Sequence, residues 1–195
     1  IRCGGFNPVE YEVFFGENGK YPPIIIELDS GEKVCLTGRI DRIDAFESGK
    51  NAYIRIVDYK SGSKEFKLSD VFYGLQIQLI TYLDAIWESD KSYLPGGMLY
   101  FKIDDPIIKR NGKMTPGDIE KAIMKQLKMK GLLLADVKLI KEMDRTMEGS
   151  SAIIPASISK EGTLGRNTSA ATIEQFISLR KHVKKLLKDI CGEIM

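Results

Sequence analysis

The sequence has 195 residues, of which 43% are hydrophobic and 29% charged, and its formal net charge is +2. This length suits one domain with a core large enough to fold without disulfides or a structural metal. The nearly balanced charge excludes a protein that binds nucleic acid through its overall charge, so such binding has to come from local patches. The chain begins at Ile1 rather than Met, and we expect a fragment of a larger protein.

The cysteines predict neither a disulfide framework nor a zinc site. Cys3, Cys35 and Cys191 are odd in number and far apart, and the sequence has no Cys-x-x-Cys pair. We therefore expect reduced thiols in a cytoplasmic protein. The sequence shows no signal peptide and no apolar run long enough to span a bilayer, so we expect no membrane partner.

The first third of the sequence predicts four strands. Alternating apolar residues predict a half-buried strand over 9–15, and a β-branched run predicts a second over 24–26. Two Ile- and Val-rich runs, 37–44 and 54–60, flank the turn formers of 47–51 and predict a hairpin. We expect the four strands to form an antiparallel or mixed meander.

The hairpin carries polar residues in an apolar setting. Asp58 and Lys60 are two apart, so they share a strand face with Ile54 and Ile56. A carboxylate and an ammonium beside apolar residues are costly unless they pair with each other or with a ligand. If Asp41 lies opposite on the neighbouring strand, the group can hold a hard divalent cation and place a positive charge beside its bound water. The alternative for an isolated Asp-x-Lys is an exposed charge at a strand end.

A helix should follow, capped by Ser69 or Asp70. Its apolar residues recur at helical spacing, so one face should pack on the sheet; they are Leu75, Leu79, Tyr82, Leu83 and Ile86. Gly74 weakens the first turn by about 1 kcal/mol relative to Ala, and we expect it to allow close contact between helix and sheet. Gln78 and Tyr82 lie four apart on one side, either as a core tyrosine with a polar neighbour or as part of a site.

The second half predicts a fifth strand over 98–103 and a loop over 104–115. A helix should run from 117 or 118 to 130, and residues 132–143 should continue as helix after a break at 128–131. The expected buried stripe of the first of these helices is Ile119, Ile123 and Leu127. Within the Gly-, Ser- and Thr-rich segment 149–169, we expect residues 152–154 to return as a strand to the sheet edge.

The last helix should run over 171–194 with an apolar stripe and a basic face. We define the basic face as Arg180, Lys181, Lys184, Lys185 and Lys188. A charge run on a helix is usually solvated surface, and the alternative is contact with phosphates. His182 lies among these lysines, and we expect it to be a surface residue rather than a catalytic one.

Three runs together resemble the PD-(D/E)XK nucleases of the RecB-like branch. They are Gly38-Arg39-Ile40-Asp41, Asp58-Tyr59-Lys60 and Gln78-Leu79-Ile80-Thr81-Tyr82. The likeness is greatest to the C-terminal nuclease domains of AddB-type proteins in bacterial helicase–nuclease complexes. It is firm over residues 34–88 and looser toward the C-terminus.

This resemblance implies an α/β fold of the restriction-endonuclease-like type, with a mixed β-sheet core flanked by helices and an inserted α/β segment. We expect residues 1–195 to form a single nuclease domain. Its core would span about 9–103 together with the C-terminal helix 171–194, and the insertion would span about 104–170.

The resemblance also assigns roles to individual residues. The expected catalytic group is Asp41, Asp58, Lys60, Gln78 and Tyr82. The two carboxylates and the backbone carbonyl of Tyr59 would bind Mg²⁺ or Mn²⁺, and Lys60 would orient or deprotonate the attacking water. Gln78 would lie beside the metal and the substrate phosphate, with Tyr82 supporting it.

The implied function is metal-dependent hydrolysis of DNA, as an exonuclease or endonuclease, within a helicase–nuclease complex that processes double-strand breaks for recombinational repair. The expected partners are DNA and an AddA-type helicase–nuclease protein, and the candidate DNA contacts are Lys181, Lys184 and Lys188. An iron–sulfur cluster is expected in full-length proteins of this type, with ligands outside this chain. Relatives also supply a His or Glu from an upstream helix, which nothing before residue 9 predicts. The alternative function is a catalytically silent DNA-binding or scaffolding domain.

Overall fold

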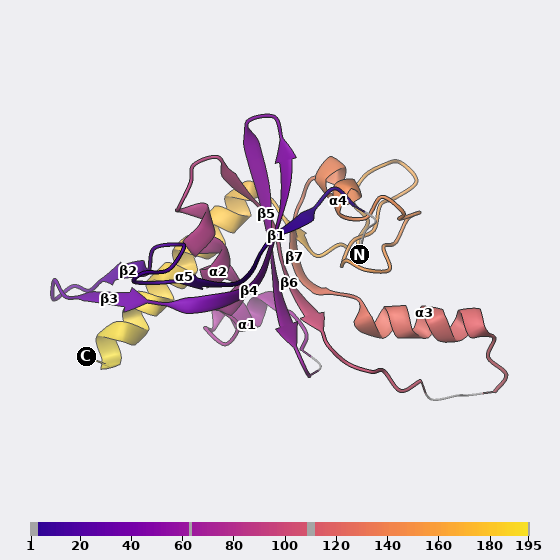
Figure 1. Ribbon diagram of the computed structural model, residues 1–195, viewed down its shortest axis with the longest axis horizontal. Coiled ribbons are helices and arrows are strands. Elements are labelled where there is room, and N and C mark those ends of the chain that lie inside the picture. Colours follow the sequence, from indigo (N-terminus) through magenta and orange to yellow (C-terminus); the bar gives the residue numbers. More distant parts are fainter. Residues whose placement is uncertain (1–3, 63, 109–111, 195) are drawn as a thin grey trace.

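The computed structural model describes residues 4–62, 64–108 and 112–194. Its strands are β1 (Asn7–Phe15), β2 (Ile24–Glu27), β3 (Lys33–Leu36), β4 (Gly38–Ser48), β5 (Asn51–Lys60), β6 (Tyr93–Lys102), β7 (Lys130–Leu134) and β8 (Ala170–Ala171). Its helices are α1 (Leu68–Phe72), α2 (Gln78–Trp87), α3 (Pro116–Leu127), α4 (Val137–Met143) and α5 (Ile173–Ile194). Six strands form one mixed sheet in the order β1-β4-β5-β6-β7-β8, and β2 and β3 form a separate two-stranded sheet (Figure 1). The predicted α/β class is confirmed.

The predicted hairpin of β4 and β5 is confirmed, and both strands are longer than the apolar runs suggested. They pair antiparallel from Arg42 opposite Val57 to Ser48 opposite Asn51, around Gly49, whose φ of 64° suits glycine. β5 then pairs in parallel with β6, and α2 forms the crossover between them. This pairing brings the ends of β5 and β6 to the same edge of the sheet.

The expected four-strand meander is wrong because β2 and β3 leave the main sheet. Ile24 and Ile26 are buried while Ile25 is exposed, so the predicted strand exists. It pairs only with β3 and contacts α5. Pro22 and Pro23 immediately precede β2, and proline cannot donate a hydrogen bond to a ladder. β1 and β4 pair directly instead.

The single helix expected from residue 69 onward is broken into α1 and α2. Gly74 has a φ of 80° and open space around the position of a Cβ, so it ends α1 rather than allowing close contact with the sheet. Leu75, expected in the buried stripe, is 75% exposed. The break makes Gln78 the first residue of α2.

Three further expectations in the second half are wrong. α3 has no buried residue, because it stands away from the sheet in Figure 1, so the stripe from Ile119 is not buried. Residues 130–134 form β7, antiparallel to β6, and only 137–143 are helical in this segment. Residues 152–154 form bends, and the strand that reaches the sheet edge is β8, parallel to β7.

Gly131 explains why β7 can approach β6 closely. A Cβ at this position would lie 2.0 Å from the carbonyl oxygen of Met98, and the φ of Gly131 is 154°. Only glycine is compatible with both features. The resulting register sets Lys130 opposite Tyr100.

The sheet has a core on each face. On one face Ile56 and Met98 pack with Leu83 of α2 and Phe176 of α5. On the other, the buried cluster contains Leu99, Leu133, Ile140 and Ile154, from β6, β7, α4 and the segment after α4. Neighbours such as Met98 and Leu99 serve opposite faces because strand side chains alternate. Among the described residues, none of the helices combines the length and apolar character needed to cross a bilayer.

Candidate active site

Asp41 and Asp58 come together at the adjoining ends of β4 and β5. The ladder ends with Arg42 opposite Val57, and the next step of that register is Asp41 with Asp58. The backbone N–H of Tyr59 donates to Asp41 Oδ2 over 2.8 Å, which fixes the Asp41 carboxylate beside β5. We expected the two carboxylates to converge if Asp41 lies opposite Asp58 on the neighbouring strand. The observed hairpin meets this condition.

Asp58 is buried, with only 2% of its surface exposed. Lys60 Nζ lies 2.5 Å from Asp58 Oδ2, yet within the described part of the chain that oxygen has no hydrogen-bond partner of acceptable geometry. Burial raises the pKa of Asp58, and the charge of Asp41 adds to this, while Lys60 and Lys64 oppose it. Burial thus disfavours the charged form of Asp58, and a bound cation would stabilise that form.

Lys60, Gln78 and Tyr82 form a chain of hydrogen bonds from β5 to α2. Lys60 Nζ donates to Gln78 Oε1 over 3.1 Å, and Gln78 Nε2 donates to the Tyr82 hydroxyl over 2.8 Å. The two helical residues are four apart and so lie on one side of α2. Tyr82 is braced by an edge-to-face contact with Phe15, with ring centroids 5.7 Å apart. The five expected catalytic residues are thus connected, through Asp58 and Lys60, in one cluster.

The cluster suits a hard divalent cation, because it offers carboxylate oxygens and the Asp58 carboxylate is buried. Asp41 and Asp58 are the residues that could hold the ion. Elsewhere in the described ranges there is no group of three or more His, Cys, Asp and Glu placed to bind a metal, and this site likewise supplies two carboxylates rather than three. The Tyr59 carbonyl remains a predicted ligand.

Residues of β6 complete the site, and sequence reasoning missed them. The parallel register sets Tyr100 beside Asp58 and Lys102 beside Lys60. The Tyr100 hydroxyl is buried and, as far as the structure describes the chain, unpartnered; burial, with the charge of Asp58, raises its pKa to about 12. Lys64 Nζ lies 5.0 Å from the Tyr100 ring centre. The parallel pairing of β5 and β6, joined through α2, brings these residues to the site.

The basic face of α5 has acidic partners. Arg180 pairs with Asp84 and Glu88. Lys184 Nζ lies 3.2 Å from Asp84 and 2.5 Å from Glu88, and Lys188 pairs with Asp29. Of the three predicted DNA contacts, Lys184 and Lys188 are thus engaged within the protein, which argues against phosphate contact there. Contact through this face, including Lys181, stays a prediction.

The remaining singled-out residues lie away from the cluster. His182 stacks on Phe72, with ring centroids 4.4 Å apart and planes 6° from parallel. Cys35 is exposed and Cys191 partly buried, and both are free thiols. Cys3 lies outside the described residues.

Comparison with known proteins identifies the family. A model of the PD-(D/E)XK nuclease superfamily matches residues 2–195. The chain is 72% identical over 200 residues to a protein of Acetivibrio thermocellus and 66% identical to one of Ruminiclostridium cellulolyticum, both named as the B subunit of an ATP-dependent helicase/deoxyribonuclease. A Thermoanaerobacter protein of the same name is 54% identical over 199 residues. All of this chain is covered, but it spans only 17–18% of those relatives. The chain belongs to the PD-(D/E)XK nuclease superfamily.

Proposed function

We propose that the chain is a Mg²⁺- or Mn²⁺-dependent deoxyribonuclease domain that hydrolyses phosphodiester bonds. The observation that carries this proposal is the state of Asp58: a buried carboxylate whose pKa is raised by burial and whose Oδ2 lies 2.5 Å from Lys60 Nζ. The second carboxylate, Asp41, is fixed beside it by the Tyr59 N–H. Folding brings the two acids together at a cost, and a hard cation offsets that cost.

Each residue of the cluster has a role in this reaction. Asp41 and Asp58 would hold the ion, with the Tyr59 carbonyl as a further ligand. When bound, the ion lowers the pKa of a coordinated water and offsets the negative charge that develops on the phosphate. Lys60 Nζ would orient the attacking water as an ammonium or, in its neutral form, accept a proton from that water. Gln78, whose amide is fixed by Tyr82, holds that ammonium toward Asp58.

We place this activity in a helicase–nuclease complex of the cytoplasm that processes broken DNA ends for recombinational repair. The proposal is supported by the names of the relatives, which describe the B subunit of an ATP-dependent helicase/deoxyribonuclease. DNA and an AddA-type helicase would then be its partners. An iron–sulfur cluster in the full-length protein would take its ligands from outside this chain.

The test compares Asp58→Ala with the unchanged chain on labelled single-stranded and duplex DNA in Mg²⁺ or Mn²⁺. We expect EDTA to abolish cleavage and Asp58→Ala to reduce it by about 10²-fold or more, because the ion supplies several kcal/mol of charge stabilisation. Asp189→Asn, which removes an exposed carboxylate of α5, is the matched control and should cut normally. Cleavage that survives in Asp58→Ala, or that ignores EDTA, would contradict the proposal.

A second candidate is a catalytically silent DNA-binding or scaffolding domain. It is favoured by the number of ligands, since the site offers two carboxylates, Asp41 and Asp58, and no third acidic or histidine ligand from the residues that the structure describes. A chain that binds DNA with and without Asp58 but never cleaves it with either metal would support this second function.

A further inference from the structure

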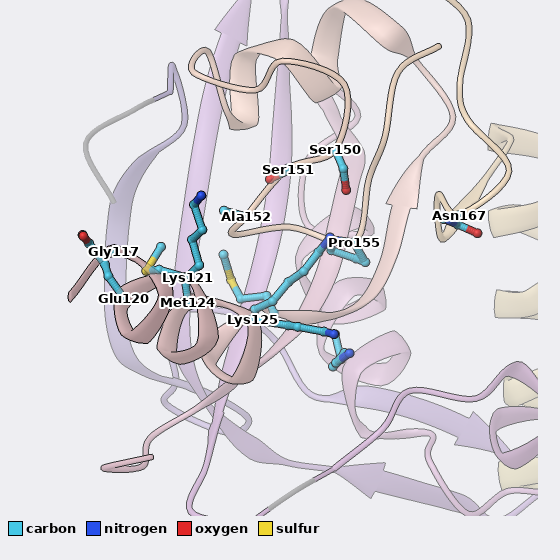
Figure 2. A pocket seen from close by; sticks show the side chains of 13 residues that line it. Gly117, Glu120, Lys121, Met124, Lys125, Ser150, Ser151, Ala152, Pro155 and Asn167 are labelled. Atoms are coloured by element: carbon cyan, nitrogen blue, oxygen red, sulfur yellow. The ribbon is translucent and has the colours of Figure 1, made fainter. Parts of the chain in front are cut away.

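Two hollows share one wall, and the smaller of them adjoins the catalytic cluster. The smaller, of about 260 Å³, is lined by Lys60 and Tyr100 and reaches the end of α3. The larger, of about 930 Å³, lies between α3 and the loop of 150–155, as Figure 2 shows. Lys125, Lys128 and Lys130 line both hollows. Because the two hollows share these residues, they form one groove that leads away from Lys60 along α3.

Positive charge is concentrated in the groove. We call it the lysine groove after Lys60, Lys64, Lys102, Lys125, Lys128 and Lys130. The acidic residues that line the two hollows are Glu65 and Glu120, and Asp104 pairs with Lys102 at the rim. Burial, together with the charge of Lys130, lowers the pKa of Lys128. The lysines thus outnumber the nearby carboxylates, and an anion would relieve their repulsion.

The wall of the groove is not only charged. Met124, Met129, Ala152 and Pro155 add apolar surface to the larger hollow. The helix α3, which forms one side of the groove, buries no residue. Its N-terminus is stabilised by a capping box between Thr115 and Asp118. A surface that combines ammonium groups with apolar side chains suits a ligand with both phosphates and exposed bases.

We propose that the lysine groove binds single-stranded DNA and leads its backbone to Asp41, Asp58 and Lys60. The inference rests on the proposed nuclease function and names where its substrate lies. Phosphates would contact the lysines, and bases would lie over Met124 and Pro155. In a duplex the bases are paired and stacked inside, so they cannot use the apolar wall. Tyr100, which lies beside Asp58 in the sheet, lines the end of the groove nearest the catalytic cluster.

The test measures binding of the full chain to labelled oligothymidylate in EDTA, so that no cleavage is needed. The variant is Lys125→Gln with Lys130→Gln, since both side chains are exposed and their loss should not affect folding. We expect the slope of log K against log salt to flatten by about 0.7 per lost phosphate contact, and so by about 1.4 for both. The matched control, Lys50→Gln with Lys91→Gln, removes the same charge from exposed positions just before β5 and β6, at the other end of these strands from Lys60, and should leave the slope unchanged.

Three outcomes would overturn the inference. An unchanged salt slope in the groove variant would show that these lysines do not contact the DNA. An equal change of slope in the groove variant and the control would show that net charge alone causes the change. Binding of a hairpin duplex as tightly as oligothymidylate would contradict the single-strand assignment. Thermal unfolding checks that each variant is folded. Lys128→Gln is a second groove variant for the same binding measurement. A chain that binds through the groove but never cuts overturns the nuclease function alone, whereas one that cuts without using these lysines overturns the groove alone.

Discussion

The basic face of α5 and the lysine groove hold five and six cations, respectively, but their surroundings differ. On α5, Arg180 and Lys184 face Asp84 and Glu88 of α2, and Lys188 faces Asp29. In the groove, Lys125, Lys128 and Lys130 have only sparse acids nearby. The first set of charges attaches a helix to its neighbours, and the second set is available to a ligand. The position of the acids, rather than the number of lysines, separates the two roles.

The attachment of α5 is partly buried, which makes it structural. Asp84 is only 3% exposed, and Arg180 also lies over the ring of Trp87 at 5.0 Å. A buried carboxylate that loses its hydrogen-bonded partner is costly. Removing Arg180 should therefore change stability, whereas removing a lysine of the groove should change function.

The largest effect is expected where the groove ends, at Lys60. Lys60→Ala should leave the affinity for divalent metal within a few-fold and reduce the rate of DNA cleavage by about 10²-fold or more, a typical loss for a general base. Lys125→Ala is the control, because it removes the same charge farther along the groove. It should raise the DNA concentration that half-saturates the enzyme but preserve the rate at saturation. A Lys60→Ala protein that cuts at the normal rate would make Lys60 one more phosphate-binding cation.

An intermediate effect is expected from Arg180→Ala, on stability. Loss of the charged hydrogen bond to Asp84 should lower the free energy of unfolding in urea by about 1.5–3 kcal/mol. Its neighbour Lys181 is exposed, so Lys181→Ala should change stability by no more than about 0.5 kcal/mol. If Arg180→Ala instead unfolds normally and weakens DNA binding, the distinction between the two regions fails.

The smallest effect is expected from Lys184→Gln combined with Lys188→Gln. Because both lysines already face carboxylates, the salt dependence of DNA binding should remain that of the unchanged chain. Phosphate contact, the alternative that the sequence left open, would instead lower the slope by about 0.7 for each lysine on single strands, or about 0.9 on duplex. Measuring this variant beside the Lys125→Gln, Lys130→Gln protein in one salt series separates the two regions directly.

Features set by neighbouring residues could be predicted from the sequence. The β4–β5 hairpin follows from two apolar runs and a turn, and the side on which Asp58 meets Lys60 follows from strand alternation. Gln78 and Tyr82 meet because helical residues four apart are neighbours. For these features the local pattern was sufficient.

Features set by distant pairing could not be predicted in this way. The lysines of 125–130 fall at the predicted end of a helix and its break, and they lie near Lys60 and Lys102 because β7 pairs with β6 and β6 with β5. The acids that face α5 come from α2 and from the turn after β2. The same dependence explains why residues 132–134, apolar and without clear periodicity, were expected in a helix and lie in a strand.

Because the site depends on the pairing of β7 with β6, Gly131 should tolerate few substitutions. Any side chain there would collide with the Met98 carbonyl, and relief would require β7 to move from β6, carrying Lys130 away from Tyr100. In a screen of every substitution for nuclease output, position 131 should be as intolerant as Asp58, although glycine carries no group that touches a metal or a phosphate. Selection for activity in such a chain would preserve the spacing of two strands as strictly as it preserves the charges that those strands present.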